Sequence, residues 1–141
     1  MTRYFGTDGI RGRANEVLSA PIAFAVGRYL GSKSSRILVG KDTRLSSSMF
    51  EAALAAGITS SGADCDLLGV CSTPALAYLT LRDSFEFGIM ISASHNPYYD
   101  NGIKCFSSQG IKISAELEDE IEAFIDGLVE LPLALDARVG Q

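Results

Sequence analysis

Short apolar runs alternate along this chain with segments of helical period, and glycine-rich connections separate them. The run 87–91 (FGIMI) is typical of a buried strand, and 37–39 (ILV) is a shorter one of the same kind. Between them Phe50, Leu54 and Ile58 recur on one face of a helix. Strands and helices that alternate in this way build a parallel sheet covered by helices. The sequence therefore predicts an α/β fold, a three-layer α/β/α sandwich with a mostly parallel mixed sheet.

Capping and breaking residues mark where these elements begin and end. Pro21 opens a helix that stops at Gly31, Ser48 caps the next one, and Thr73 with Pro74 opens a third. We expect one domain over residues 1–130. The sequence also predicts a strand at 67–68 and, after an Asn101-Gly102 turn, an antiparallel strand at 103–106. A last helix should begin at Ser114, with one apolar face formed by Leu117, Ile121, Phe124 and Leu128. Residues 131–141 should form a tail or the start of an interdomain linker.

Composition narrows the class of protein. The 141 residues are 47 % hydrophobic and 21 % charged, which is typical of a globular domain. The net charge of −5 argues against nucleic acid as a partner. Eight of the twelve basic residues nevertheless lie between Arg3 and Arg44, so a small anion could bind near the amino-terminal end.

Cysteine usage and hydropathy predict a cytoplasmic protein. Cys65, Cys71 and Cys105 are odd in number and lack CxxC spacing, as expected for reduced thiols rather than a disulfide framework or a zinc site. The first residues contain no apolar signal-peptide core, and no apolar run approaches the ~20 residues that span a membrane. We expect no membrane association.

The loop after the strand 87–91 holds the strongest candidate for chemistry. Ser94 and His95, the chain's only histidine, follow the carboxyl end of that strand, where open α/β sheets bind ligands. A simple turn shaped by Asn96 is the alternative. Because there is no G-x-S-x-G elbow, a Ser-His-Asp hydrolase is the least favoured enzyme class.

A glycine-rich loop at 5–12 (FGTDGIRG) is the second candidate. Its three glycines allow the backbone to approach a ligand closely, and Arg11 offers a rigid donor fork suited to phosphate. The alternative is a glycine-rich turn whose arginine is merely solvated. The pattern leaves these two interpretations open.

Two further loops and a lysine complete the set. At 40–47 we favour an Asp42–Arg44 ion pair that braces the loop over direct substrate contact, and at 69–74 we favour helix capping. Lys104 follows Ser94 by ten residues, so a hairpin would bring its ammonium back toward the serine, where phosphoryl transfer needs positive charge. An exposed strand lysine is the alternative.

Four ordered motifs together resemble one family. Segments 4–12 (YFGTDGIRG), 40–44 (GKDTR), 72–74 (STP) and 91–97 (ISASHNP), with Lys104 following, are similar to the first of the four domains of the α-D-phosphohexomutase superfamily. The Ser-Ala-Ser-His-Asn-Pro form favours the branch that acts on glucosamine phosphates, because members acting on glucose or mannose phosphates more often carry threonine at the position of Ser92.

The resemblance implies a phosphoserine mechanism. Phosphorylated Ser94 would donate its phosphoryl group to glucosamine 6-phosphate. The resulting sugar bisphosphate, which is both intermediate and activator, would return its other phosphoryl group and leave α-glucosamine 1-phosphate. This product would serve UDP-N-acetylglucosamine and cell-wall synthesis. Either His95 or Lys104 would move protons, and Ser92 is a secondary candidate. The residues implied to bind substrate or phosphate are Thr7, Asp8, Arg11 and Asn96, and those implied in catalysis are Ser94, His95, Lys104 and Arg11.

The family's magnesium site lies only partly in this chain. One Mg²⁺ per active site would bind Ser94 through its phosphate, whereas its other ligands belong to a DGDxDR-type loop of the second domain, which this sequence lacks. We therefore expect a fragment or truncated product that is inactive alone. The implied partners are a phosphosugar, the enzyme's remaining domains and, as an open option, a second copy of the full-length enzyme. Outside this reading, a glucose- or mannose-phosphate mutase domain and a non-catalytic phosphate-binding or interaction module remain alternatives.

Overall fold

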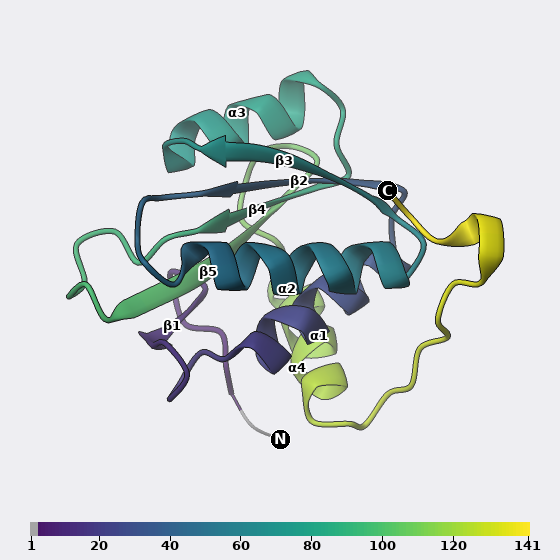
Figure 1. Cartoon of the computed structure of the whole chain (residues 1–141), viewed down its shortest axis with the longest axis horizontal. Helices are drawn as coiled ribbons and strands as arrows, with labels where there is room; N and C mark the ends of the chain where they lie inside the picture. The colour runs from purple at the N-terminus through teal and green to yellow at the C-terminus, as the bar shows by residue number, and fades with distance from the viewer. Residues whose placement is uncertain (1–2) are drawn as a thin grey trace.

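Helices cover both faces of a single five-stranded sheet in the computed structural model, which describes residues 3–141 (Figure 1). The strand order is β1-β5-β4-β2-β3. β2 pairs in parallel with β3 and β4, whereas β5 runs antiparallel to β4 and β1. The elements are β1 (Ile10–Arg13), α1 (Ala20–Ser32), β2 (Arg36–Lys41), α2 (Ser47–Ser60), β3 (Asp64–Val70), α3 (Thr73–Arg82), β4 (Phe87–Ile91), β5 (Asp100–Ser107), α4 (Ala115–Ile125) and a 3-10 turn (Asp136–Arg138).

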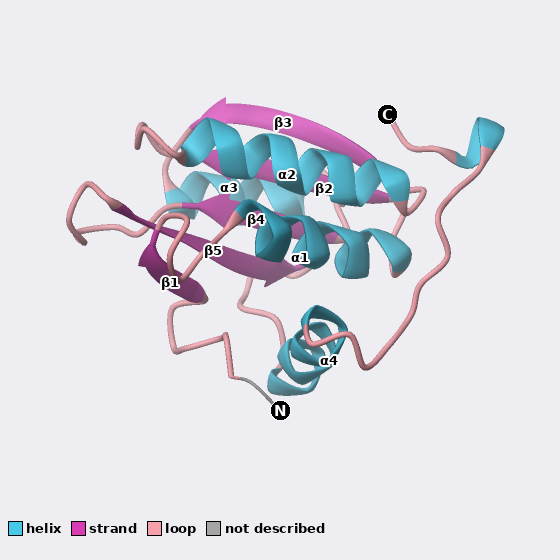
Figure 2. Cartoon of the chain, turned by 60° about the horizontal axis from the view of Figure 1, so that its bottom comes forward, coloured by secondary structure: helices cyan, strands magenta, loops and turns pink. Residues whose placement is uncertain are grey.

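The three predicted layers are confirmed. α3 alone lies on one face of the sheet, and α1, α2 and α4 lie on the other (Figures 1 and 2). The larger core cluster fills the α1–α2–α4 side, with Phe50, Leu54 and Ile58 fully buried against the sheet. A smaller cluster that includes Leu76 and Met90 lies under α3. Burial on both faces explains why the central strands β2 and β4 read as continuous apolar runs.

Local patterns predicted most elements, but the helix starts differ by a residue or two. The N-cap of α2 is Ser46 rather than Ser48, because Ser47 is already helical. Ser72, not Thr73, caps α3, and its hydroxyl accepts the Ala75 N–H at 3.2 Å. The last helix ends at Ile125, so the predicted apolar face stops short of the exposed Leu128.

Two predictions about the amino-terminal loop and the turn after the serine are wrong. Segment 5–12 was expected to be a loop throughout, yet residues 10–13 form β1, whose partner is β5. Asn101 and Gly102 were expected to form a turn, yet both lie inside β5. Asn101 is fully buried in a strand because α2 supplies hydroxyl partners for its amide.

The segment 131–141 packs back on the domain. The buried guanidinium of Arg28 donates to the carbonyls of Leu131 at 2.8 Å and Pro132 at 3.1 Å. Farther on, the Cys65 N–H donates to the Gln141 carbonyl at 2.7 Å, which brings the chain end beside the start of β3. This segment is therefore attached at both of its ends.

Two more observations concern the cysteines and the hydropathy of the helices. All three cysteines are free, and burial raises the pKa of the Cys105 thiol to about 12. Among residues 3–141, no helix has the length and apolar character needed to cross a membrane.

Candidate functional site

The serine loop, residues 92–99, connects β4 to β5 at the carboxyl end of the parallel strands. The Ser92 N–H donates to the Gly102 carbonyl at 2.9 Å, which closes the base of the loop. The Asp42 N–H donates to the Ile91 carbonyl at 3.0 Å, so the loop after β2 lies directly beside it. Two predicted motifs far apart in sequence therefore meet at one edge of the sheet.

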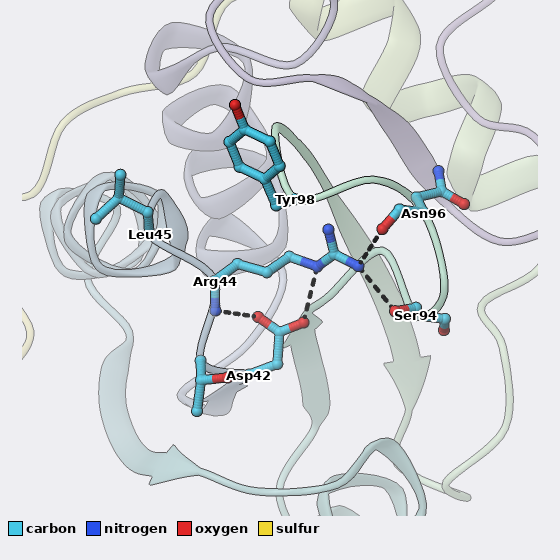
Figure 3. A pocket seen from close by; sticks show the side chains of 7 residues that line it. Asp42, Arg44, Leu45, Ser94, Asn96 and Tyr98 are labelled. Atoms are coloured by element: carbon cyan, nitrogen blue, oxygen red, sulfur yellow. Dashed lines mark hydrogen bonds and ion pairs between the residues drawn. The ribbon is translucent and has the colours of Figure 1, made fainter.

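Arg44 holds the serine loop by donating hydrogen bonds to backbone carbonyls of the loop (Figure 3). Its Nη1 donates to the carbonyls of Pro97 at 2.7 Å and Asp100 at 3.0 Å. Its Nη2 donates to the carbonyls of Ser94 at 2.8 Å and Asn96 at 3.0 Å. A planar guanidinium can satisfy four acceptors in this way, whereas an ammonium cannot. One side chain thus fixes the path of the whole loop.

Asp42 orients that guanidinium. Arg44 Nε donates to Oδ2 at 3.1 Å, and Oδ1 accepts both the Arg44 N–H at 3.0 Å and the Ser47 hydroxyl at 2.8 Å. Burial by itself would raise the pKa of Asp42. The hydrogen bonds from Arg44, Ser47 and Ser92, together with the Arg44 charge, outweigh it and hold this pKa below its ordinary value of 3.8.

Asn101 joins the same network from β5. Its Nδ2 donates to the hydroxyls of Ser46 at 2.8 Å and Ser47 at 3.1 Å, and its Oδ1 accepts the Gly102 N–H at 2.9 Å. The start of α2, the loop after β2 and the strand after the serine are therefore locked together. A continuous set of polar contacts runs from Asn101 through Ser47 and Asp42 to Arg44.

Ser94 is held in an uncommon conformation with its side chain exposed. Its φ of 52° lies in the left-handed region, which costs a non-glycine residue on the order of 1 kcal/mol. The bond from Arg44 to its carbonyl stabilises this conformation, and its own N–H donates to the Ser92 hydroxyl at 3.0 Å. The Ser94 hydroxyl accepts from Arg11 Nη2 at 3.3 Å. The structure thus joins Ser94 to Arg11.

Two glycines allow Arg11 to reach the serine. Arg11 in β1 lies opposite Gly102 in β5, and a Cβ at Gly102 would lie 2.8 Å from Arg11 Cγ. Gly9 has a φ of 87°, and a Cβ there would collide with the Ile103 carbonyl. Within residues 3–141, Arg11 Nε is buried without a hydrogen-bond partner.

Two pockets flank the Arg11–Ser94 contact. One, of about 480 Å³, lies beside the serine loop, and the other, of about 360 Å³, lies in the glycine-rich loop. The first is lined by Asp42, Thr43, Arg44, Leu45, Ser94, Asn96 and Tyr98 (Figure 3), and the second by Tyr4, Gly6, Thr7, Asp8, Gly9 and Arg11. Thr7 and Asp8 thus share a pocket with Arg11, and Asn96 shares one with Ser94.

The two predicted proton carriers are placed differently. His95 follows Ser94 on the exposed turn, and in the described part of the chain no hydrogen bond or ion pair reaches it. Lys104 lies opposite Met90 in the β4–β5 pairing, and its Nζ is 5.6 Å from the centroid of the Phe106 ring. No hydrogen bond joins Lys104 to Ser94 within residues 3–141. Its role in catalysis stays a prediction.

Sequence reasoning missed what Arg44 and Asn101 do for the serine loop. The favoured Asp42–Arg44 ion pair is present, but the arginine also reaches residues 50 or more positions later. An Asp-x-Arg directly after a buried strand was the available signal for Arg44. Asn101 offered a misleading one, because Asn-Gly is the commonest hairpin-turn pair.

The described residues give no metal centre by themselves. Among residues 3–141, no three His, Cys, Asp or Glu side chains gather closely enough to hold a metal ion. Both oxygens of Asp42 are already engaged by Arg44 and Ser47. The exposed Ser94 hydroxyl could offer oxygen ligands to a metal ion if it carried a phosphate.

Comparison with known proteins assigns the arrangement to a family. Residues 2–130 match the family model described as phosphoglucomutase/phosphomannomutase, alpha/beta/alpha domain I. The chain belongs to this family. The match covers both loops that form the Arg11–Ser94 contact, so the geometry described above lies within the family domain.

Relatives agree in sequence and in structure. The chain is 48 % identical over 147 residues to a phosphoglucosamine mutase from Lachnoclostridium phytofermentans, covering 100 % of this chain and 33 % of that protein. It is 54 % identical over 134 residues to one from Staphylococcus aureus, covering 89 % and 30 %. A phosphoglucomutase/phosphomannomutase family protein from Burkholderia thailandensis superimposes with a TM-score of 0.78 at 26 % identity, covering 98 % and 32 %. The chain spans about a third of the length of these relatives.

We predict that Arg44 is required for the serine loop rather than for bulk stability alone. Arg44→Ala leaves four carbonyls without their donor and should lower the free energy of unfolding by about 1.5 to 3 kcal/mol. Arg44→Lys should rescue little of it, because one ammonium cannot reach all four carbonyls. Amide hydrogen exchange at Asn96 and Asp100, with urea unfolding, measures both effects. Arg82→Ala is the control, since its exposed pair with Asp83 is worth at most about 1 kcal/mol; unchanged exchange in Arg44→Ala would contradict the assignment.

We predict that Asp42 stabilises the fold in a pH-dependent way. Because its folded pKa lies below 3.8, the ionised carboxylate stabilises the fold above that pH and loses this contribution as the pH falls through the folded pKa. Urea unfolding of the native protein and Asp42→Asn at several pH values should show their stability difference largest near neutrality and shrinking below about pH 4. A difference that stays constant down to pH 2.5 would rule out the charged role.

Proposed function

We propose that this chain is the phosphoserine-bearing first domain of a phosphoglucosamine mutase, which interconverts glucosamine 6-phosphate and α-glucosamine 1-phosphate. The observation that carries the proposal is the contact of Arg11 with the exposed hydroxyl of Ser94, 3.3 Å away. The name phosphoglucosamine mutase comes from relatives 48 % and 54 % identical. The product would supply UDP-N-acetylglucosamine and cell-wall synthesis in the cytoplasm.

Ser94 would carry the phosphoryl group between two forms of the sugar. In the forward step the bond from phosphorus to Ser94 Oγ breaks and a bond from phosphorus to a sugar hydroxyl oxygen forms. The hydroxyl proton leaves and the serine oxygen takes up a proton. The sugar bisphosphate then reorients and returns its other phosphoryl group to Ser94. His95 and Lys104 are the two candidates for moving these protons.

Charge on the phosphoryl group explains the surrounding residues. A serine phosphate carries about −1.5 to −2 charges near pH 7, so it needs a cation beside it. Arg11 supplies a guanidinium within hydrogen-bond distance of Oγ, and its buried Nε has no other partner among residues 3–141. Arg44 holds the Ser94 carbonyl, and all of its side-chain donors are used on backbone carbonyls and on Asp42. Arg11 is therefore the residue we assign to the phosphate.

Substrate phosphate would bind in the pockets on either side. Thr7 and Asp8 line one with Arg11, and Asn96 lines the other with Ser94. Asn96 Nδ2 donates to Asp100 Oδ2 at 3.3 Å, so Asn96 also shapes the loop. The Ser92 hydroxyl accepts the Ser94 N–H, and Ser92 is the secondary candidate.

A magnesium ion fits this chain through one ligand. Mg²⁺ takes oxygen ligands, which a phosphate on Ser94 would offer. When bound, the ion would neutralise charge on the phosphoryl group. Its other ligands would come from the enzyme's further domains. Residues 131–141 would begin the linker to them, and a homodimer of the whole enzyme is the further assembly we propose.

We predict that Ser94 is indispensable wherever this chain stands at the amino-terminal end of a full-length enzyme, as in its relatives. Ser94→Ala removes the phosphoryl acceptor, so turnover should fall at least about a thousandfold. Peptide mass mapping of the unsubstituted enzyme should find phosphate on Ser94, and mapping of Ser92→Ala should still find it there. Normal turnover by Ser94→Ala, or robust turnover by residues 1–141 alone, would refute the proposal.

The sugar is decided by comparing kcat/KM for glucosamine, glucose and mannose phosphates in the same full-length enzyme. We expect the glucosamine phosphates to be preferred. A preference for glucose or mannose phosphates would assign the domain to a phosphoglucomutase or phosphomannomutase, the activities named in the family description.

A further inference from the structure

Helix α4 holds the chain just before the glycine-rich loop. Oε2 of Glu122 accepts the backbone N–H groups of Tyr4 at 2.6 Å and Phe5 at 2.8 Å. Oε1 of the same carboxylate accepts from Arg3 Nη1 at 3.1 Å. The Glu122 side chain is only 1 % exposed. Three donors on one buried carboxylate form strong, charge-assisted hydrogen bonds.

The glycines of the glycine-rich loop follow immediately after these contacts. Phe5 is buried in the core, and Gly6 and Gly9 then exchange hydrogen bonds across the neck of the loop, Gly6 N–H to Gly9 carbonyl at 2.8 Å and the reverse at 3.4 Å. Tyr4 itself lines the pocket that contains Thr7 and Arg11. A displacement of Tyr4 or Phe5 would therefore change the shape of that pocket directly.

The other end of the loop is fixed independently. β1 pairs with β5 from Ile10 to Arg13, which sets the position of the Arg11 backbone. Besides Glu122, two nearby acids accept hydrogen bonds from side chains of this segment: Asp119 of α4 from Arg3, and Asp126, which directly follows α4, from the Tyr4 hydroxyl. Glu122 is the one that accepts backbone N–H groups.

We propose that Glu122 is a positioning residue for the phosphate-binding loop formed by residues 6–11, an inference that rests on the proposed function of that loop. The carboxylate fixes the amino-terminal end of the loop as the β1–β5 pairing fixes its carboxyl-terminal end. With both ends fixed, the loop and Arg11, which line the pocket, need little further ordering when phosphate arrives. Glu122 acts through Tyr4 and Phe5 and does not itself contact the ligand.

Glu122→Gln is the sharpest test because it keeps the shape and removes the charge. The amide can still accept at one oxygen, but its NH₂ group faces the Arg3 donors. Glu120→Gln is the matched control: Glu120 also lies on α4 and also accepts a hydrogen bond, from Tyr29 Oη at 2.7 Å, but it contacts α1 rather than residues 3–5. Arg3→Ala is a second variant, which keeps the Glu122 carboxylate and its backbone contacts but removes a cationic partner whose own side chain is 58 % exposed.

Two measurements on the 141-residue chain separate positioning from phosphate binding. Amide hydrogen exchange at Tyr4, Phe5 and Gly9 reports how firmly the loop is held, and titration with inorganic phosphate at constant ionic strength, followed by NMR at Gly6 and Gly9, reports binding. In Glu122→Gln we expect exchange about tenfold faster or more, a change worth ~1.4 kcal/mol, and phosphate binding several-fold weaker. Arg3→Ala should change both in the same direction by less, and Glu120→Gln should change neither.

The outcomes distinguish failure of this inference from failure of the proposed function. Exchange of Val39 and Ile89 at native rates confirms that a variant is folded. Native exchange at Tyr4 and Phe5 in Glu122→Gln, or native phosphate affinity despite faster exchange, overturns the positioning role. Absence of phosphate binding by the unsubstituted chain overturns the proposed role of the loop instead, and with it the purpose assigned to Glu122.

Discussion

The guanidinium of Arg44 organises the edge of the sheet on which the candidate site stands. It donates to three carbonyls of the serine loop and to the carbonyl of Asp100, the first residue of β5, and is oriented by Asp42. Such a loop has no secondary structure of its own to satisfy its carbonyls, and Arg44 supplies donors that hold them in one arrangement. Together with the Ser92 hydroxyl, which accepts the Ser94 N–H, this donor holds Ser94 in a left-handed conformation with its side chain exposed.

Two arginines divide the work around the serine. Arg44 spends its donors on backbone carbonyls and on Asp42, which leaves it neutralised and unavailable to a ligand. Arg11 of β1 donates to the Ser94 hydroxyl, and its buried Nε has no hydrogen-bond partner among residues 3–141. Arg44 thus holds the serine rigidly, while Arg11 is the cation beside its hydroxyl. This arrangement suits the transfer of a charged group, because the charge meets groups that are already oriented.

Elements whose signal is local could be predicted from the sequence, and elements that depend on a distant partner could not. The apolar run 87–91 is β4 to the residue, since burial on both faces leaves a continuous apolar pattern. β1 has one apolar residue, Ile10, and exists because β5 pairs with it. Asn101 looked like a turn because the hydroxyls that satisfy its buried amide lie on α2. The reach of Arg44 across 50 residues was equally invisible, although its ion pair with Asp42 was not.

The most direct test of this account is the ionisation of a phosphate placed on Ser94. Phosphoserine introduced at position 94 can be followed by ³¹P NMR as the pH is varied. We predict a second pKa clearly below the ordinary value of about 6, because the Arg11 guanidinium favours the dianion, and a return toward that value in Arg11→Ala. A phosphate that titrates like one on an unstructured peptide, with or without Arg11, would contradict the claim that this site is built to carry a phosphoryl group.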